Sequence, residues 1–250
     1  MNEAYWIAWI VIAFASGSIP FGVLLARLRG VDLRTVGSGN TGATNVGRAL
    51  GRRWGTACFL LDAAKGAVPV LVSGAVMGVL GQGVGTEVTA ADWGWVAVAI
   101  AAILGHVFSP FLSFKGGKGV ATACGALLAL YPVMTIAVLI AGLLFVVVLL
   151  ATGFMSVASM VAAVSLPITA GLFGAAEVST SDGDPATLLP GICTGLLIAA
   201  TVVWRHRSNL QRVRSGTEPR VLGRGRMRAR SSTPAGDEPS NPNTTSTNHH

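Results

Sequence analysis

Six long runs of apolar residues constrain the fold of this chain more than any other feature. A helix of about 20 apolar residues crosses the hydrocarbon core of a bilayer, and each run approaches or exceeds that length. Only 12% of the residues are charged, whereas soluble domains carry roughly 25%. The chain is therefore predicted to be an all-α polytopic integral membrane protein. The runs are 5–26, 66–82, 93–114, 120–150, 154–176 and 188–204.

The charged residues indicate how the chain is oriented in the membrane. Every lysine and arginine lies within residues 27–65, at positions 115 and 118, or from Arg205 onward. The charged residues of the connectors 83–92 and 177–185 are all acids. Basic loops stay on the cytoplasmic side, so we expect the N-terminus outside and the C-terminus in the cytoplasm. We attribute the net charge of +7 to this topology and not to nucleic-acid binding.

The number of crossings follows from the orientation. Lys118 and Glu177 lie on opposite sides, so an odd number of helices joins them. A single helix over residues 120–176 would extend about 85 Å, against roughly 30 Å of hydrocarbon. Three helices fit, with breaks at Pro132 and at the Thr152-Gly153 pair, and one of them must be short. We predict seven transmembrane helices; the alternative replaces one pair of crossings by a re-entrant segment.

The segment GSGNTGATN, residues 37–45, is the first of three polar segments on the predicted cytoplasmic face. Its glycines permit backbone conformations closed to other residues, so that successive N–H groups can form an anion-binding nest. Arg48 adds a planar fork suited to phosphate. Taken alone, the segment is equally well interpreted as a glycine-rich turn between helices. The candidate ligands are Ser38, Gly39, Asn40, Thr41, Thr44, Asn45 and Arg48.

The second segment, GHVFSPFLSFKGGKGVAT, places two lysines among three glycines just before a predicted helix at Val120. A helix N-terminus preceded by glycines favours anions. Lysines that only anchor a helix end at the membrane surface are the alternative. His106 lies one turn inside the bilayer from this loop, where either substrate binding or a structural role fits. The candidate phosphate-binding residues of the loop are Lys115, Gly116, Gly117, Lys118 and Gly119.

The third segment, WRHRSNLQRVRSGTE, begins where the last predicted helix leaves the bilayer. His206 and Asn209 are three residues apart and so share one face of a helix. We expect most of the arginines here to anchor the protein by the positive-inside rule. Glu218 is an acid in a basic stretch, and we expect it to pair with one of these arginines and fix the loop.

Two further groups lie near these segments. Asp62 and Lys65, in LDAAKG, are three residues apart at the expected start of the second helix, where a structural ion pair at the interface is the simpler interpretation. Ser156 follows the Thr152-Gly153 turn, which the crossing count returns to the cytoplasmic side. All of these segments are predicted to converge at one rim as a site for one or two phosphates. The surrounding apolar spans would admit an acyl chain from the side.

With these motifs the sequence resembles the bacterial membrane acyl-phosphate:glycerol-3-phosphate acyltransferases of the PlsY type. The resemblance runs in order through SGSIPFG, GSGNTGATNVGRALG, LDAAKG, GHVFSPFLSFKGGKGVAT and RHRSNLQRVRSGTE. It implies transfer of a fatty acyl group from acyl phosphate to the 1-hydroxyl of sn-glycerol 3-phosphate, which gives lysophosphatidic acid and phosphate for phospholipid biosynthesis. It also implies a single transmembrane catalytic domain, residues 1–218, in the bacterial cell membrane with its active site facing the cytoplasm.

The resemblance further implies roles for individual residues. The serine and arginine at positions 38 and 48 match an essential pair of the first motif, and the glycines at 116, 117 and 119 match a loop linked to acyl-phosphate binding. His206 and Asn209 match a polar pair of the third motif, and Glu218 matches its closing acid. Ser156 matches a substrate-contacting serine. Lys118 joins the catalytic group because a cation would stabilise charge on the leaving phosphate.

The residues suit acyl transfer from an activated donor. Acyl phosphate needs no strong protein nucleophile, and the hydroxyl proton can pass to His206 or to a substrate phosphate oxygen; we favour the phosphate, because the site is rich in cations and poor in bases. Neither His106 nor His206 precedes an aspartate by five positions, so the His-x4-Asp motif of acyltransferases with soluble donors is missing.

The alternative function is a transporter or flippase for a phosphorylated molecule. Such proteins usually place ionisable groups toward the centres of their spans. We disfavour this alternative because Asp62 is the only acid in such a position here.

The expected partners are glycerol 3-phosphate, acyl phosphate, membrane lipids and an upstream enzyme that forms acyl phosphate. No cofactor or metal site is expected, because the three cysteines show no CxxC or Cys/His spacing; a magnesium ion bridging phosphates stays open. The tail, residues 219–250, is basic and then rich in Pro, Ser, Thr and Asn, and is predicted to be disordered. Its arginine cluster, residues 224–230, is expected to lie against anionic headgroups.

Overall fold

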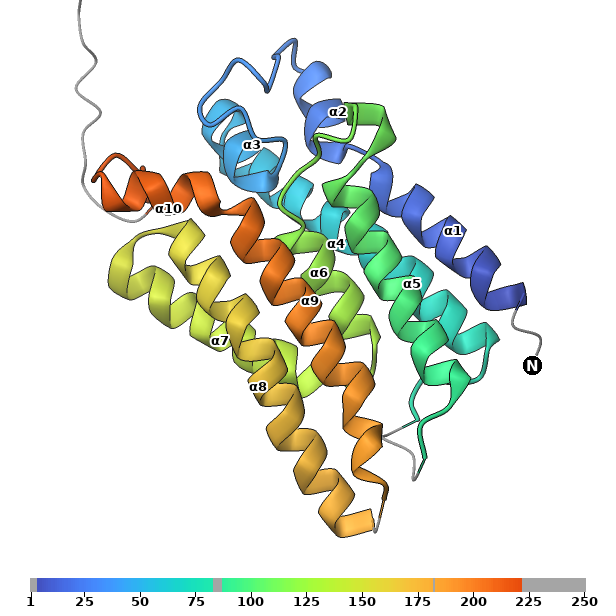
Figure 1. Cartoon of the computed structure of the whole chain (residues 1–250). Helices are drawn as coiled ribbons and strands as arrows, with labels where there is room; N and C mark the ends of the chain where they lie inside the picture. Colours follow the sequence, from blue (N-terminus) through green and yellow to red (C-terminus); the bar gives the residue numbers. More distant parts are fainter. Residues whose placement is uncertain (1–3, 83–86, 182, 222–250) are drawn as a thin grey trace, which may run out of the picture.

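A computed structural model describes residues 4–82, 87–181 and 183–221, and within them the chain forms helices and no strand (Figure 1). The predictions for residues 222–250, including the arginine cluster, lie outside this part. The helices are α1 (Ala4–Ser18), α2 (Phe21–Arg27), α3 (Ala43–Leu50), α4 (Arg52–Val76), α5 (Ala90–Val107), α6 (Val120–Ala129), α7 (Thr135–Thr152), α8 (Met155–Ser181), α9 (Leu189–Arg205) and α10 (Arg207–Arg214), with 3-10 turns at Pro110–Leu112 and Pro185–Leu188.

Six helical stretches in the described residues are long and apolar enough to cross a membrane, which confirms the prediction of an all-helical membrane protein. Helix α6 is also apolar, but its 10 residues extend only about 15 Å, half of the hydrocarbon core. The run 120–176 divides into three helices as predicted, since α6 ends before Pro132 and α7 ends at Thr152. The described residues thus contain six membrane-length helices and one half-length helix where seven crossings were predicted.

The second long helix, α4, begins at Arg52, well before the apolar run that was expected to start it. Asp62 and Lys65 therefore lie inside the helix and are buried, so the predicted ion pair forms, but within the helix and not at its start as expected. Their charges compensate each other there: Lys65 Nζ lies 2.8 Å from Asp62 Oδ1 and donates to the carbonyl oxygen of Ile19 at 2.7 Å.

The helices form two groups that pack against each other through α5, α6 and α9. Helices α1, α4 and α6 surround α5, the most buried of the spans, and α7, α8 and α9 pack side by side (Figure 1). The main hydrophobic core lies around α5. A capping box fixes the start of this helix, because Thr89 accepts from the N–H of Asp92 and the Asp92 carboxylate accepts from the N–H of Thr89.

The short helices α2, α3 and α10 gather at one end of the bundle, at the top of Figure 1, together with the loop that precedes α6. A second hydrophobic cluster packs α2 and α3 onto α4 there; its buried members are Ala26, Leu33, Val46 and Cys58. The turn between α7 and α8 is tied to the same end, because the N–H of Val221 donates to the carbonyl oxygen of Gly153 at 2.8 Å. The polar segments of the sequence therefore meet at one end of the molecule.

Helices α4 and α6 cross so closely that position 125 requires glycine. A Cβ at Gly125 would lie 2.0 Å from the carbonyl oxygen of Ala63. Small residues permit such close backbone approach between membrane helices. The crossing fixes the position of α6, and with it the position of Lys118 just before the helix begins.

We expect Gly125→Ala to lower the melting temperature of the detergent-solubilised protein by roughly 5 °C, because overpacking a tight contact costs about 1–3 kcal/mol. Gly142→Ala in α7 is the matched control, since nothing lies within 4 Å of the Cβ that it adds. Equal melting temperatures for the two variants would contradict this account of the crossing.

Candidate active site

A cavity of about 420 Å³ lies where the three polar segments meet. The convergence predicted from the sequence is confirmed, because each segment contributes side chains to this one cavity. Apolar side chains of α4, α7 and α8 complete the lining. The polar residues that line it are Ser38, Asn40, Thr44, Asn45, Arg48, Arg52, Thr56, Asp62, His106, Lys118, Ser156, Ser159, His206, Asn209 and Glu218.

Asn45 of α3 holds the loop of the first motif in place. Its amide nitrogen donates to the carbonyl oxygens of Leu33 at 3.2 Å and Val36 at 2.9 Å, and its Oδ1 accepts the N–H of Ser38 at 3.0 Å. Gly37 has a φ of +60°, and a Cβ there would lie 2.4 Å from Asn45 Oδ1. Both N–H bonds of the Asn45 amide are used within the loop, so we assign this residue to positioning instead of substrate binding.

The anion-binding nest predicted for this loop is not formed by three of its N–H groups. The N–H of Ser38 is bound by Asn45, that of Gly39 donates to the carbonyl oxygen of Val36, and that of Gly42 donates to Asn40 Oδ1. The side chains that this motif brings to the cavity include those of Ser38, Thr44 and Arg48. Neither Gly39 nor the buried Thr41 lines this cavity; Thr41 lines a much smaller one beside it.

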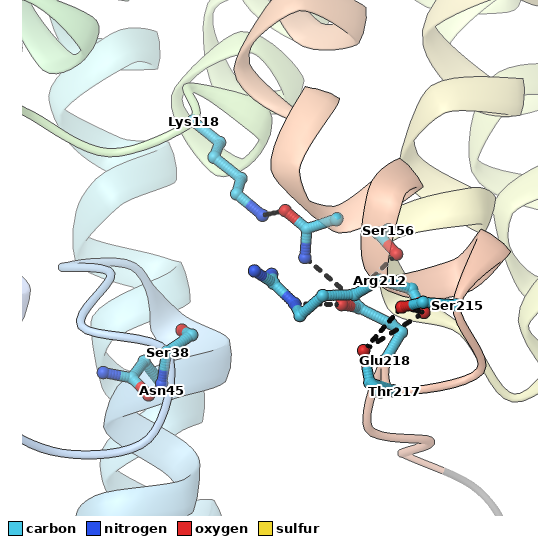
Figure 2. Close-up of polar contacts among 9 residues, drawn as sticks. Ser38, Asn45, Lys118, Ser156, Arg212, Ser215, Thr217 and Glu218 are labelled. Atoms are coloured by element: carbon cyan, nitrogen blue, oxygen red, sulfur yellow. Dashed lines mark hydrogen bonds and ion pairs between the residues drawn. The ribbon is translucent and has the colours of Figure 1, made fainter.

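The Glu218 carboxylate brings together donors from two helices (Figure 2). Its Oε1 accepts from Ser156 Oγ of α8 at 2.9 Å and from Asn209 Nδ2 of α10 at 2.7 Å. Its Oε2 accepts from Arg212 Nε at 2.8 Å, which confirms the predicted pairing with an arginine. Lys118 Nζ donates to Asn209 Oδ1, so the network reaches the start of α6.

Figure 2 shows Ser38 and Asn45 apart from the hydrogen-bonded network to which Lys118, Ser156 and Glu218 belong. Residues of all three motifs line the same cavity. The sequence analysis assigned Ser156 to the site only from the resemblance and from the number of crossings. In the structure Ser156 is buried and lines the cavity.

Charge states in the site follow from burial and from this network. Burial lowers the pKa of Lys118 to about 8; the Glu218 charge opposes the shift, while Arg212, Arg205 and Arg48 add to it. Burial alone would raise the pKa of Glu218, but hydrogen bonds from Asn209, Arg212 and Ser156 hold that pKa below its ordinary value. At neutral pH Glu218 is therefore ionised and Lys118 is largely charged.

His206 is buried at the end of α9 and is neutral at physiological pH. Burial, followed by the nearby charge of Lys118, lowers its pKa to about 4. Its Nδ1 lies 2.8 Å from the carbonyl oxygen of Val202, so in the neutral ring Nδ1 carries the proton and Nε2 keeps its lone pair.

The glycine loop of the second motif folds back onto the end of α5. The N–H of Gly116 donates to the carbonyl oxygen of Val107 at 3.1 Å, and that of Gly117 to the carbonyl oxygen of His106 at 3.2 Å. Neither glycine lines the cavity, and the exposed Lys115 also lies outside it. Lys118 and Gly119 do line it, together with the first residues of α6.

His106 lies on the deep side of the cavity, on α5. Its Nδ1 is 3.7 Å from Asp62 Oδ1, and both residues line the main cavity as well as the smaller one that contains Thr41. Helices α4 and α5 thus present a buried cluster of Asp62, Lys65 and His106 behind the site.

Sequence reasoning did not assign a role to several lining residues on α4. Arg52, Thr56 and Phe59 lie on one face of that helix at spacings of four and three residues, and all three line the cavity. The periodicity was present in the sequence, but it becomes meaningful only when the helix is known to begin at Arg52. Phe145 and Met155 complete the apolar wall from α7 and α8.

We expect Asn45→Asp to destabilise the protein by about 1–3 kcal/mol, because it removes both donors and places negative charge against two carbonyl oxygens. Asn40→Asp is the matched control, since Asn40 Oδ1 only accepts the N–H of Gly42 and a carboxylate preserves that contact. Thermal unfolding in detergent measures both variants. Indistinguishable melting temperatures would show that Asn45 does not hold the loop.

Comparison with known proteins agrees with this geometry. The family model for glycerol-3-phosphate acyltransferase matches residues 7–216. The glycerol-3-phosphate acyltransferase of Geobacter sulfurreducens is 45% identical over 84% of this chain and 94% of the relative. That of one Thermus thermophilus strain is 43% identical over 88% of this chain and 96% of the relative.

Two crystal structures of PlsY, an integral membrane glycerol 3-phosphate acyltransferase, are also similar. The glycerol 3-phosphate form has a TM-score of 0.70 and 35% identity, over 88% of this chain and 96% of that one. The lysophosphatidic acid form has a TM-score of 0.67 and 34% identity, over 86% and 95%. Cavity, motifs and relatives agree, and the chain belongs to the glycerol-3-phosphate acyltransferase family.

Proposed function

We propose that this cavity transfers a fatty acyl group from acyl phosphate to the 1-hydroxyl of sn-glycerol 3-phosphate, which yields lysophosphatidic acid and phosphate. The proposal rests on one observation: cationic and apolar side chains line the same cavity. Lys118, Arg48 and Arg52 supply positive charge, and Phe59, Phe145 and Met155 supply an apolar wall. A phosphorylated polar acceptor and a phosphorylated lipid donor need this combination.

The phosphates bind to the cations and to the first turn of α6. Lys118 and the N–H groups at that helix N-terminus favour an anion, and Arg48 offers a planar fork from the opposite wall. Asn209, Glu218 and Ser156 keep Lys118 in place through the hydrogen-bond network. Ser38, exposed at the cavity, is placed to bind the substrates through its hydroxyl.

The reaction needs a base that takes the proton of the attacking hydroxyl. The oxygen of the 1-hydroxyl attacks the acyl carbon, a new ester bond forms, and the bond between the acyl carbon and the phosphate oxygen breaks. His206, with a pKa of about 4, is a weaker base than a phosphate monoester with a second pKa of about 6. We therefore assign the proton to a substrate phosphate oxygen and assign His206 Nε2 to accepting a hydrogen bond from the hydroxyl.

We place the cavity on the cytoplasmic side of the bacterial plasma membrane. The positive-inside rule supports this orientation, because Arg27, Arg29 and Arg34 lie near the cavity end of the bundle together with the arginines that follow α9. The N-terminus is then outside and the C-terminus inside, with α6 as a short seventh crossing. Glycerol 3-phosphate arrives from the cytoplasm, and an upstream enzyme supplies acyl phosphate.

Donor choice tests the proposal directly. Purified protein in detergent should form lysophosphatidic acid and release phosphate from palmitoyl phosphate, and should do neither with palmitoyl-CoA. Ser38→Ala and Arg48→Ala should each reduce this rate at least 100-fold, because they remove groups that bind the reacting phosphates, while their melting temperatures stay near wild type. Preference for palmitoyl-CoA, or full activity in both variants, would refute it.

The pKa of Lys118 predicts the pH dependence. A charged lysine binds phosphate, so the contribution of Lys118 should be complete well below pH 8, and activity should fall as pH rises through about 8, where Lys118 loses its proton. Lys118→Arg keeps its charge and should abolish this alkaline decline in kcat/KM. Lys115→Arg should keep it, because Lys115 lies outside the cavity. An unchanged decline in Lys118→Arg would assign the titration to another group.

A further inference from the structure

Arg205, the last residue of α9, reaches from that helix to the glycine loop before α6. Its Nε donates to the carbonyl oxygen of Gly117 at 3.2 Å, and its Nη2 donates to the carbonyl oxygen of Gly116. The N–H groups of the same two glycines are bound by carbonyl oxygens at the end of α5. The backbone of both glycines is therefore held on the N–H side by α5 and on the carbonyl side by α9.

We call the contact of Arg205 with Gly116 and Gly117 the clamp. In the sequence it lies directly next to two residues that line the cavity. Lys118 follows Gly117, and His206 follows Arg205. Both of these neighbours line the cavity, whereas Gly116 and Gly117 do not. Two hydrogen bonds from one planar guanidinium therefore link the backbone that carries Lys118 to the backbone that carries His206.

We propose that Arg205 is a positioning residue that sets the separation of Lys118 and His206, and that the glycine loop acts through Lys118 instead of through its own N–H groups. The inference rests on the acyl-transfer function proposed above. Glycine is needed in the loop because the chain lies directly against α5: a Cβ at Gly116 would lie 2.0 Å from the carbonyl oxygen of His106. The loop is a support for the cation, and Arg205 fixes that support.

The neighbouring Arg207, the first residue of α10, provides a contrast. It also lies over the Trp204 ring, at 4.9 Å, and donates to the carbonyl oxygen of Trp204, but it is exposed and donates no hydrogen bond to the loop within the described residues. Arg207 therefore fits the general role of a basic membrane anchor. Arg205, at 5.6 Å from the same ring, adds the two bonds to the loop.

Replacing Arg205 by lysine separates the effect of its two hydrogen bonds from the effect of its charge. An arginine fork places two donors in one plane, whereas a lysine ammonium supplies the same charge at a single point. Arg205→Lys keeps the positive charge near Lys118, along with that of Arg48 and Arg212 and the opposing charge of Glu218. It loses the simultaneous contact with two carbonyl oxygens. Arg207→Lys is the matched control.

Steady-state kinetics with palmitoyl phosphate and glycerol 3-phosphate tests the proposal. Arg205→Lys should lower kcat at least 10-fold and change KM for glycerol 3-phosphate less than 3-fold, with a melting temperature within a few degrees of wild type. Arg207→Lys should match wild type in all three. In a Lys118→Ala background, Arg205→Lys should cost less than a further 3-fold, because residues that act through one another are not additive.

Hydrogen exchange of the peptide covering residues 113–119 gives a readout that does not depend on turnover. It should be faster in Arg205→Lys than in Arg207→Lys. The proposal would be overturned if Arg205→Lys showed wild-type kinetics and wild-type exchange. It would also be overturned if the effects of Arg205→Lys and Lys118→Ala were fully multiplicative, or if Arg205→Lys failed to fold. An inactive wild-type protein that nevertheless shows the exchange difference would count against the proposed reaction and leave the clamp intact.

Discussion

The site depends on one carboxylate, that of Glu218, placed among cations. Its side chain is only 6% exposed, and an unpaired charge at that depth would be costly. Donors from Ser156, Asn209 and Arg212 compensate it, and they come from α8 and α10. Asn209 then passes the network to Lys118, so a single negative charge joins three segments that are far apart in the sequence.

The geometry around this carboxylate distinguishes the residues that we propose bind the substrates from the residues that hold those groups in place. Lys118, Arg48 and the N-terminus of α6 provide positive charge, and the neutral His206 provides an acceptor. Several backbone groups of both glycine-rich segments are bound internally: the N–H groups of Ser38, Gly39 and Gly42 in the first motif, and those of Gly116 and Gly117 in the second. Gly116 and Gly117 allow close approach of the chain to α5, whereas Gly37, Gly39 and Gly119 have a positive φ.

Much of the arrangement could be predicted from the sequence. Hydropathy predicted the membrane helices and the breaks near Pro132 and Thr152, and charge distribution predicted that the motifs would meet at one end. The start of α4 was missed, because a hydropathy run stops at Asp62 and Lys65 while the helix continues through them as a buried ion pair. The spacing predicted the ion pair, but its burial depends on tertiary contacts such as that of Lys65 with the carbonyl oxygen of Ile19.

In the site, too, some features depend on tertiary contacts that could not be predicted from the sequence. Residue types identified the candidate cations, but the sequence did not show which of Lys115 and Lys118 contacts the phosphate. In the structure Lys118, which directly precedes the N-cap Gly119 of α6, lines the cavity, and Lys115 does not. The nest predicted for the first loop was wrong for Ser38, Gly39 and Gly42, since spacing alone does not reveal which acceptors an N–H group meets.

A crystal structure of this protein with glycerol 3-phosphate tests the central claim most directly. The account predicts that the phosphate lies between Lys118 and Arg48, at the N-terminus of α6, with the 1-hydroxyl directed toward His206. A phosphate bound elsewhere on the protein, with this cavity unoccupied at saturating glycerol 3-phosphate, would contradict it.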